Sequence, residues 1–155
     1  MSATQSTKHS DETLREVIAR RALTPPPETP EEAILRKLRA HLAQGAIASA
    51  QRLARTLKAT FTYPSAMIAV AEAQHRAGQA ASARRTLVTA QRRVQHFYEG
   101  DHWNGYPRAY YLLDIVQAQL ALGDAAGAAQ TAQTITTPDY RPRALQATGQ
   151  VQDRG

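Results

Sequence analysis

Apolar residues recur every three or four positions along most of the chain, as they do on one face of an α-helix. In the first long stretch these residues are Leu35, Leu38 and Leu42. Prolines and glycines interrupt the pattern, because proline favours the start of a helix and glycine its end. We therefore predict an all-α protein with helices over residues 30–44, 46–60, 64–77 and 79–98, a third pair that starts at Pro107 and turns at Gly123, and a last helix over 141–153.

Three glycines, Gly45, Gly78 and Gly123, fall between the two helices of each predicted pair, at intervals of 33 and 45 residues. A fourth, Gly155, follows 32 residues later. A period near 33 residues predicts stacked helical hairpins, which present extended surfaces to partners. An alanine stands five positions after each of the three glycines, where a small side chain lets two helices approach closely. The residues expected to face inward are Ala50, Leu53, Ala54 and Leu57, then Ala83, Leu87 and Ala90, and then Ala128, Ala132 and Ile135.

A proline-rich segment separates these pairs from the N-terminal part of the chain. Residues 24–28 (TPPPE) predict a stiff, extended connector, because consecutive prolines fix φ and lack N–H donors. A short amphipathic helix over 11–23 precedes this connector, and Thr29 opens a capping box for the next helix. We therefore divide the chain into an N-terminal tail, short helix and Pro-rich linker over 1–29 and a helical repeat domain over 30–155.

The junction within each pair resembles that of the tetratricopeptide repeat family, in which the turn residue is followed by alanine and then by larger residues four and seven positions later. The segments 71–83 and 116–128 carry this pattern. The resemblance covers about residues 30–153 and implies a right-handed α-solenoid of about three helical hairpins plus a terminal helix. It also implies that the first helices line a concave groove. The chain departs from the family at its tyrosine position, which is occupied by His41, Gln74 and Gln119.

Basic residues are concentrated in one block of the sequence, although the net charge is only +6. Residues 33–98 carry eleven basic side chains and one acid, Glu72, whereas each flanking segment carries four basic and six acidic side chains. Such a block could attract an acidic protein, a nucleic acid or an anionic surface, and it is equally typical of a solvated helix face. We predict a basic ridge on the second helices of the first two pairs, in which Arg52 and Arg85 lie side by side. Its members are Arg52, Arg55, Lys58, Arg84, Arg85, Arg92 and Arg93.

The longer interval between Gly78 and Gly123 holds an aromatic loop over residues 96–107, and six of the nine aromatic residues fall within 97–111. Loops on a rigid scaffold commonly carry function, and tryptophan and tyrosine are enriched at binding hot spots. These aromatics could equally fill the gap beside an overhanging helix. If the aromatic loop has a binding role, its residues and those of the concave side bind the partner. They are Phe97, Tyr98, His102, Trp103, Tyr106, Arg39, Glu72 and Gln117.

Several chemical classes find no support in the sequence. The chain has no cysteine, no Gly-rich phosphate loop and no HExxH motif. Four loop residues could offer nitrogen or oxygen atoms to a metal, but their spacing fits no metal motif; they are His96, Glu99, Asp101 and His102. We therefore expect no enzyme, cofactor or metal site. The chain also lacks an apolar run of about 18–20 residues and an apolar leader, so we expect a cytoplasmic protein without a membrane span.

These observations predict a non-catalytic interaction module that binds a protein or peptide, an acidic one included, through the repeat groove and the loop 96–107. The alternative is a binder of nucleic acid or another polyanion that uses the basic ridge. Leu145 and Val151 lie on the last predicted helix, which has no partner helix. Because an uncovered end of a helical stack needs a cap, a homodimer through this helix is a further expectation.

Overall fold

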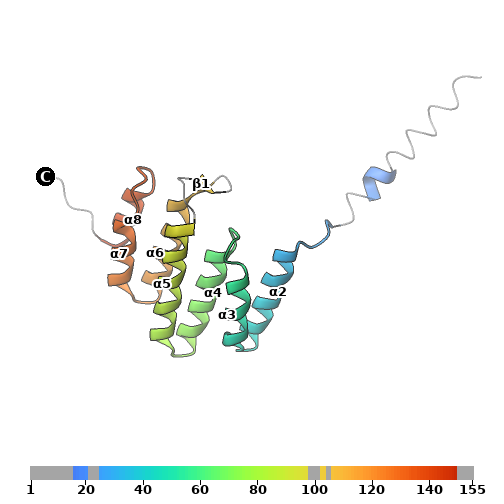
Figure 1. The fold of residues 1–155 in the computed structure, drawn as a ribbon, viewed down its shortest axis with the longest axis horizontal. Helices are drawn as coiled ribbons and strands as arrows, with labels where there is room; N and C mark the ends of the chain where they lie inside the picture. Colours follow the sequence, from blue (N-terminus) through green and yellow to red (C-terminus); the bar gives the residue numbers. More distant parts are fainter. Residues whose placement is uncertain (1–15, 21–24, 98–101, 104–105, 150–155) are drawn as a thin grey trace, which may run out of the picture.

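The computed structural model describes residues 16–20, 25–97, 102–103 and 106–149. Within these ranges the fold is all-α apart from one pair of two-residue strands, as the sequence predicts (Figure 1). Residues 16–20 are helical, inside the predicted helix over 11–23. The remaining elements are α2 (Pro30–Ala43), α3 (Ile47–Thr56), α4 (Tyr63–Arg76), α5 (Ala80–Phe97), β1 (His102–Trp103), β2 (Tyr106–Pro107), α6 (Arg108–Ala121), α7 (Ala125–Gln133) and α8 (Arg141–Ala147).

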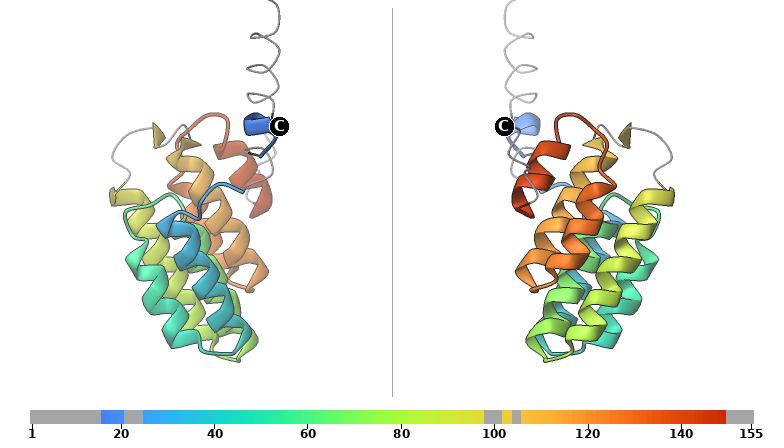
Figure 2. Two further views of the ribbon diagram at one scale, coloured as in Figure 1. Left: turned by 90° about the vertical axis from the view of Figure 1, so that its right-hand side faces the viewer. Right: turned by 90° about the vertical axis from the view of Figure 1, so that its left-hand side faces the viewer.

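The helices form three hairpins, α2–α3, α4–α5 and α6–α7, which stand beside one another in chain order (Figure 1). The first helices contact each other along the row, α2 with α4 and α4 with α6. Each second helix also packs on the next hairpin, α3 on α4 and α5 on α6, and α8 closes the row against α6 and α7. The view along the row shows the orange hairpin α6–α7 displaced sideways from the blue and teal hairpin α2–α3 (Figure 2).

The three glycines make the same turn in all three hairpins. Gly45, Gly78 and Gly123 have φ values of 72°, 76° and 75°, a left-handed conformation that side chains disfavour. After each glycine, the next N–H donates to the carbonyl five residues earlier, over 2.8 Å in every case. This is the hydrogen bond of a glycine C-cap, so the predicted turns are confirmed. The capping box of Thr29 is also present, because Thr29 and Glu32 satisfy each other's backbone N–H groups.

The inward positions predicted from the glycine offsets form the core. Ala50, Ala83 and Ala128 are at most 1% exposed, so the second helix of each hairpin reaches close to its neighbours there. The positions four and seven residues further on are also buried. Leu53, the one exception among the predicted inward residues, is only partly buried and packs against the core from its edge.

Two helices, α3 and α8, are shorter than predicted. The helix predicted over 46–60 ends at Thr56, whose hydroxyl donates to the Leu53 carbonyl, and hydroxyls of threonines compete in this way with helix hydrogen bonds. The helix predicted over 141–153 ends at Ala147. Gly149 follows with a φ of 68°. Gly149 therefore ends the last helix, where the sequence analysis had counted Gly155 as the fourth glycine; Gly155 and Val151 lie outside the described residues.

Buried polar side chains distinguish the second and third hairpins. At the position four residues before the glycine, Gln74 is 4% exposed and its amide oxygen accepts a 2.7 Å hydrogen bond from the Thr86 hydroxyl. The equivalent Gln119 is fully buried, and neither its amide nitrogen nor its amide oxygen has a hydrogen-bond partner among the described residues. The equivalent of Thr86 is Thr131, whose hydroxyl donates instead to the Gly127 carbonyl over 2.9 Å.

Candidate binding surfaces

A cleft lies between the first helices of the second and third hairpins, and its volume is about 420 Å³. It holds Glu72 and Gln117, two of the three residues predicted to face the groove, whereas Arg39 is exposed on α2 and does not line this cleft. The lining also includes one carboxylate that the sequence analysis did not single out, Asp114. The full lining is Ser65, Ile68, Ala69 and Glu72 from α4, and Asp114, Gln117, Ala118 and Ala121 from α6.

The two carboxylates of this cleft are not neutralised within the described part of the chain. Neither Glu72 nor Asp114 forms a hydrogen bond or an ion pair with another described residue. Burial raises the pKa of Asp114 above its ordinary value of 3.8, because a low-dielectric surrounding disfavours the charged form. Ile68 and Ala118 supply apolar surface beside the carboxylates. The cleft can therefore receive a cationic group together with its aliphatic stem.

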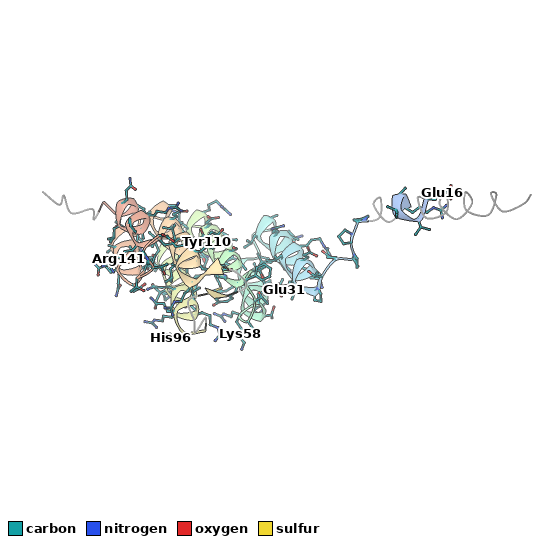
Figure 3. The ribbon with its side chains drawn as sticks, turned by 90° about the horizontal axis from the view of Figure 1, so that it is seen from above. Glu16, Glu31, Lys58, His96, Tyr110 and Arg141 are labelled. Carbon is teal, nitrogen blue, oxygen red and sulfur yellow. The ribbon has the colours of Figure 1, made fainter. Side chains whose placement is uncertain are left out.

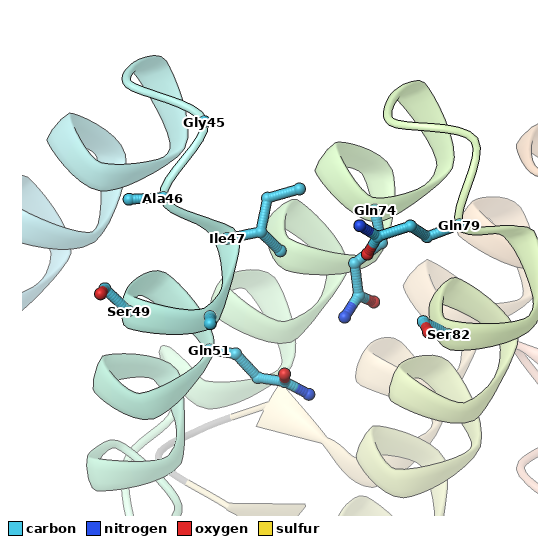
Figure 4. Close-up of a pocket in the computed structure, with 9 residues that line it drawn as sticks. Gly45, Ala46, Ile47, Ser49, Gln51, Gln74, Gln79 and Ser82 are labelled. Carbon is cyan, nitrogen blue, oxygen red and sulfur yellow. The ribbon is translucent and has the colours of Figure 1, made fainter.

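A second hollow region lies between α3 and α5, on the second helices of the first two hairpins. One part, of about 410 Å³, is next to the turn at Gly45, and its close-up shows the amides of Gln51, Gln74 and Gln79 within it (Figure 4). The adjoining part, of about 330 Å³, is lined by Arg55 and Arg85 among others. Both parts share Gln51, Gln74 and Ser82, so they form one polar groove. We call it the α3–α5 groove.

The predicted ridge residues repeat their local geometry in the first two hairpins. Arg52 donates to the Ser49 hydroxyl over 2.9 Å, and Arg85 donates to the Ser82 hydroxyl over 3.1 Å. Both arginines stand three residues after their serine and seven after their glycine. Arg55, rather than Arg52, lines the α3–α5 groove together with Arg85.

The basic side chains continue toward the far end of α3 and α5. Arg93 donates to the Lys58 carbonyl over 3.2 Å and so joins α5 to the turn after α3. Burial raises the pKa of the nearby Tyr63 hydroxyl, and the positive charges of Arg93 and Arg55 partly oppose this shift. Seen from above, Lys58 and His96 lie along the same edge of the molecule (Figure 3). No aspartate or glutamate occurs in the sequence of α3 or α5.

The predicted aromatic loop contains a strand pair that the sequence analysis did not anticipate. β1 and β2 are antiparallel, with His102 opposite Pro107 and Trp103 opposite Tyr106. The sequence does carry a signal for it, because Asn-Gly between aromatic residues favours a β-hairpin. Phe97 is the last residue of α5, and Tyr98 lies outside the described residues.

The segment 96–107 is closed at its base by a contact between the flanking helices. Arg108, the first residue of α6, donates to the Gln95 carbonyl in α5 over 3.1 Å. Next to it, the ring of the partly exposed Tyr110 packs edge-on against the buried Tyr111, with 5.3 Å between the ring centroids. The base of the loop is therefore held by the hairpin stack.

A scan of protein-family models and searches of curated proteins and of solved structures found no match to this chain. Its function is therefore argued from the geometry of these surfaces. In the described residues, no helix has both the length and the apolar character that crossing a membrane requires. The same residues contain no group of three or more histidine, aspartate or glutamate side chains placed to hold a metal ion.

Proposed function

We propose that the chain is a tetratricopeptide-like α-solenoid that acts as a non-catalytic interaction module for a protein or peptide partner. Three features support the solenoid: three glycine turns with the same hydrogen bond, buried alanines at the same offset, and first helices that contact one another along the row. In such a stack each repeat contacts its neighbours, and the surfaces between repeats are available to partners. The first helices then line the inner side of the stack.

The binding site of this module is the cleft between α4 and α6. The observation that carries the proposal is a pair of carboxylates, Glu72 and Asp114, that line an otherwise apolar and amide-bearing cleft without any partner in the described residues. Asp114 is half-buried without a partner among the described residues, which costs free energy that a bound cation would offset, whereas Glu72 is exposed and adds its charge to the cleft. The ligand is therefore a peptide segment that inserts a lysine or arginine side chain. The basic block over residues 33–98 suggests an acidic partner, but the local charge of the cleft favours a basic one.

The strand pair β1–β2 is the second contact of the proposed partner. Its backbone register places Trp103 opposite Tyr106, and the contact between Arg108 and Gln95 holds the base of the loop. Because tryptophan contributes more to binding than most residues when it is buried by a partner, Trp103 is the anchor outside the cleft. Truncation of this anchor should weaken binding without changing which peptides are selected.

Selection from a random peptide library on the immobilised protein tests the proposal. Peptides enriched by the wild type should share a lysine or arginine, and labelled copies should bind at least about tenfold more weakly to Glu72→Gln/Asp114→Asn, because this variant removes both charges of the cleft, including that of the half-buried Asp114. The matched control is Glu31→Gln/Asp139→Asn, which removes the same charge outside the cleft. Enrichment of peptides without a basic residue, or equal affinity for both double variants, would contradict the proposal. Circular dichroism verifies that each variant is folded.

A further inference from the structure

The surface formed by α3 and α5 differs from the cleft in charge and in lining. Seven basic residues lie on these two helices and on the turn that follows α3, and we call them the basic face. They are Arg52, Arg55, Lys58, Arg84, Arg85, Arg92 and Arg93. Glu72, the only acid within residues 33–97, lines the cleft between α4 and α6 instead. The positive potential of the basic face is therefore not balanced by carboxylates on the same helices.

We propose that the α3–α5 groove binds the sugar–phosphate backbone of a single-stranded nucleic acid, at a site independent of the peptide cleft. Proteins contact phosphate and sugar oxygens mainly with arginine and lysine and with the hydroxyl and amide groups of serine, threonine and glutamine. The groove offers this set, because Arg55 and Arg85 line it together with Gln51, Ser82 and Thr89. The two arginines, together with the Gln51 amide and the Ser82 hydroxyl, match a chain of phosphodiesters.

Local contacts keep two side chains of the basic face in place before a ligand binds. The guanidinium of Arg85 donates to Ser82, and Arg93 donates to the Lys58 carbonyl, so both side chains have restricted positions. Side chains that are already ordered lose less conformational entropy when they bind. Arg85 and Arg92 are seven residues apart on α5, or about 10 Å at the rise of an α-helix. The basic face is therefore long enough to contact more than one phosphate.

Single-stranded nucleic acid fits this face better than a membrane or a duplex does. Membrane-surface helices place large apolar side chains beside the basic ones, but among the exposed large apolar residues of the described structure only Phe61 belongs to α3, α5 or the turn after α3. A duplex is stiff over about 150 base pairs, so its backbone cannot bend to follow a groove that is formed by two short helices. A flexible single strand can follow the groove and bring successive phosphates to its basic side chains.

Fluorescence anisotropy with a labelled oligo(dT) of about 16 nucleotides tests this site. We expect binding that weakens with salt between about 50 and 200 mM, with a log–log slope of about −2 to −3.5, as for three to five phosphate contacts on a single strand. Arg55→Gln/Arg85→Gln should lower the affinity at least about tenfold and reduce the slope by about 1.4. The control Lys37→Gln/Arg141→Gln removes the same charge on exposed parts of α2 and α8 and should change the affinity less than about twofold.

Several results would overturn the inference. Absence of oligo(dT) binding at low salt would do so, as would an equal loss of affinity in the two double variants. Tighter binding to poly-glutamate, or to phosphatidylserine–phosphatidylcholine vesicles, than to oligo(dT) would assign the basic face to another class of partner. The Arg55→Gln/Arg85→Gln variant should keep its affinity for peptides selected on the cleft, and Glu72→Gln/Asp114→Asn should keep its affinity for oligo(dT). Each site can therefore fail without the other.

Discussion

In the second hairpin Gln74 accepts a hydrogen bond from Thr86, whereas the equivalent Gln119 of the third hairpin is buried without a partner among the described residues. The backbone turn is nevertheless the same in both hairpins, with the same 2.8 Å hydrogen bond after Gly78 and after Gly123. The turn and the buried alanines therefore define the hairpin. The hydrogen bonds of the buried amides differ between the hairpins and are not part of the repeated geometry.

The cap of the second helix also differs between the two hairpins. In the third hairpin Asp124 accepts a hydrogen bond from the Gly127 N–H and caps α7. A Cβ atom at residue 127 would collide with the Asp124 carboxylate, so a larger residue here would displace the Asp124 side chain that caps α7. The equivalent residue of the second hairpin is Ser82, which has no aspartate before it and instead accepts a hydrogen bond from Arg85. The basic face can thus include the second hairpin, while the third hairpin has a neutral glutamine, Gln130, in place of Arg85.

The largest expected difference between the hairpins lies nine residues after the glycine, where both positions are fully buried but hold side chains of different size, Leu87 and Ala132. Leu87→Ala leaves a cavity and should lower the free energy of unfolding by about 2–5 kcal/mol. Ala132→Leu overfills the third hairpin and should cost about 1–3 kcal/mol. Urea unfolding followed by circular dichroism measures both. An Ala132→Leu variant as stable as the wild type would mean that the third hairpin has space for a leucine at this position, as the second hairpin does for Leu87.

Replacing the two buried glutamines should affect the free energy of unfolding differently: Gln74→Leu should lower it, and Gln119→Leu should not. Gln74→Leu leaves the Thr86 hydroxyl buried without its acceptor and should destabilise the protein by about 1–3 kcal/mol. Gln119→Leu removes two buried polar atoms that have no partner among the described residues, so the free energy of unfolding should stay unchanged or rise. The same urea titration compares the two variants. Equal destabilisation by both would show that Gln119 also depends on a hydrogen bond in solution.

The smallest expected effect is the pH dependence of stability that Asp114 introduces in the third hairpin. The equivalent residue of the second hairpin is Ala69, which lines the same cleft and does not titrate. Burial raises the pKa of Asp114 in the folded state. The folded protein therefore binds a proton more readily than the unfolded chain, and stability is lost as the pH rises through the folded-state pKa. Asp114→Asn should consequently be more stable than the wild type at pH 7, and this gain should shrink as the pH approaches about 4. A gain that is constant with pH would exclude the carboxylate charge as its cause.

The hairpin fold could be predicted from the sequence because its determinants are local. A glycine at a fixed offset from a buried alanine specifies both the turn and the close helix contact, and Thr29, Pro30 and Glu32 specify a helix start. The end of α3 could not be predicted in this way, because the Thr56 hydroxyl competes for a backbone carbonyl only once the helix exists. The apolar spacing alone would continue the helix beyond this residue.

The candidate sites were less predictable because they depend on distances between helices. Glu72 and Gln117 were expected on the inner side from their offset to the glycines, and they line one cleft. Asp114 was missed because its neighbours Leu113 and Ile115 are ordinary core residues, and nothing local marks the acid between them. The pairing of Arg55 with Arg85 across a groove was also missed, since equal offsets from the glycines pointed to Arg52 instead.

The hydrogen bond from Arg108 to the Gln95 carbonyl has a consequence for protein engineering. It joins the residues that flank the 96–107 segment, so the two ends of that segment are held close together, and foreign sequences of different length can replace it at a modest entropic cost that grows slowly with length. Because of this hydrogen bond, the protein can serve as a small, cysteine-free display scaffold in which foreign sequences are inserted between α5 and α6.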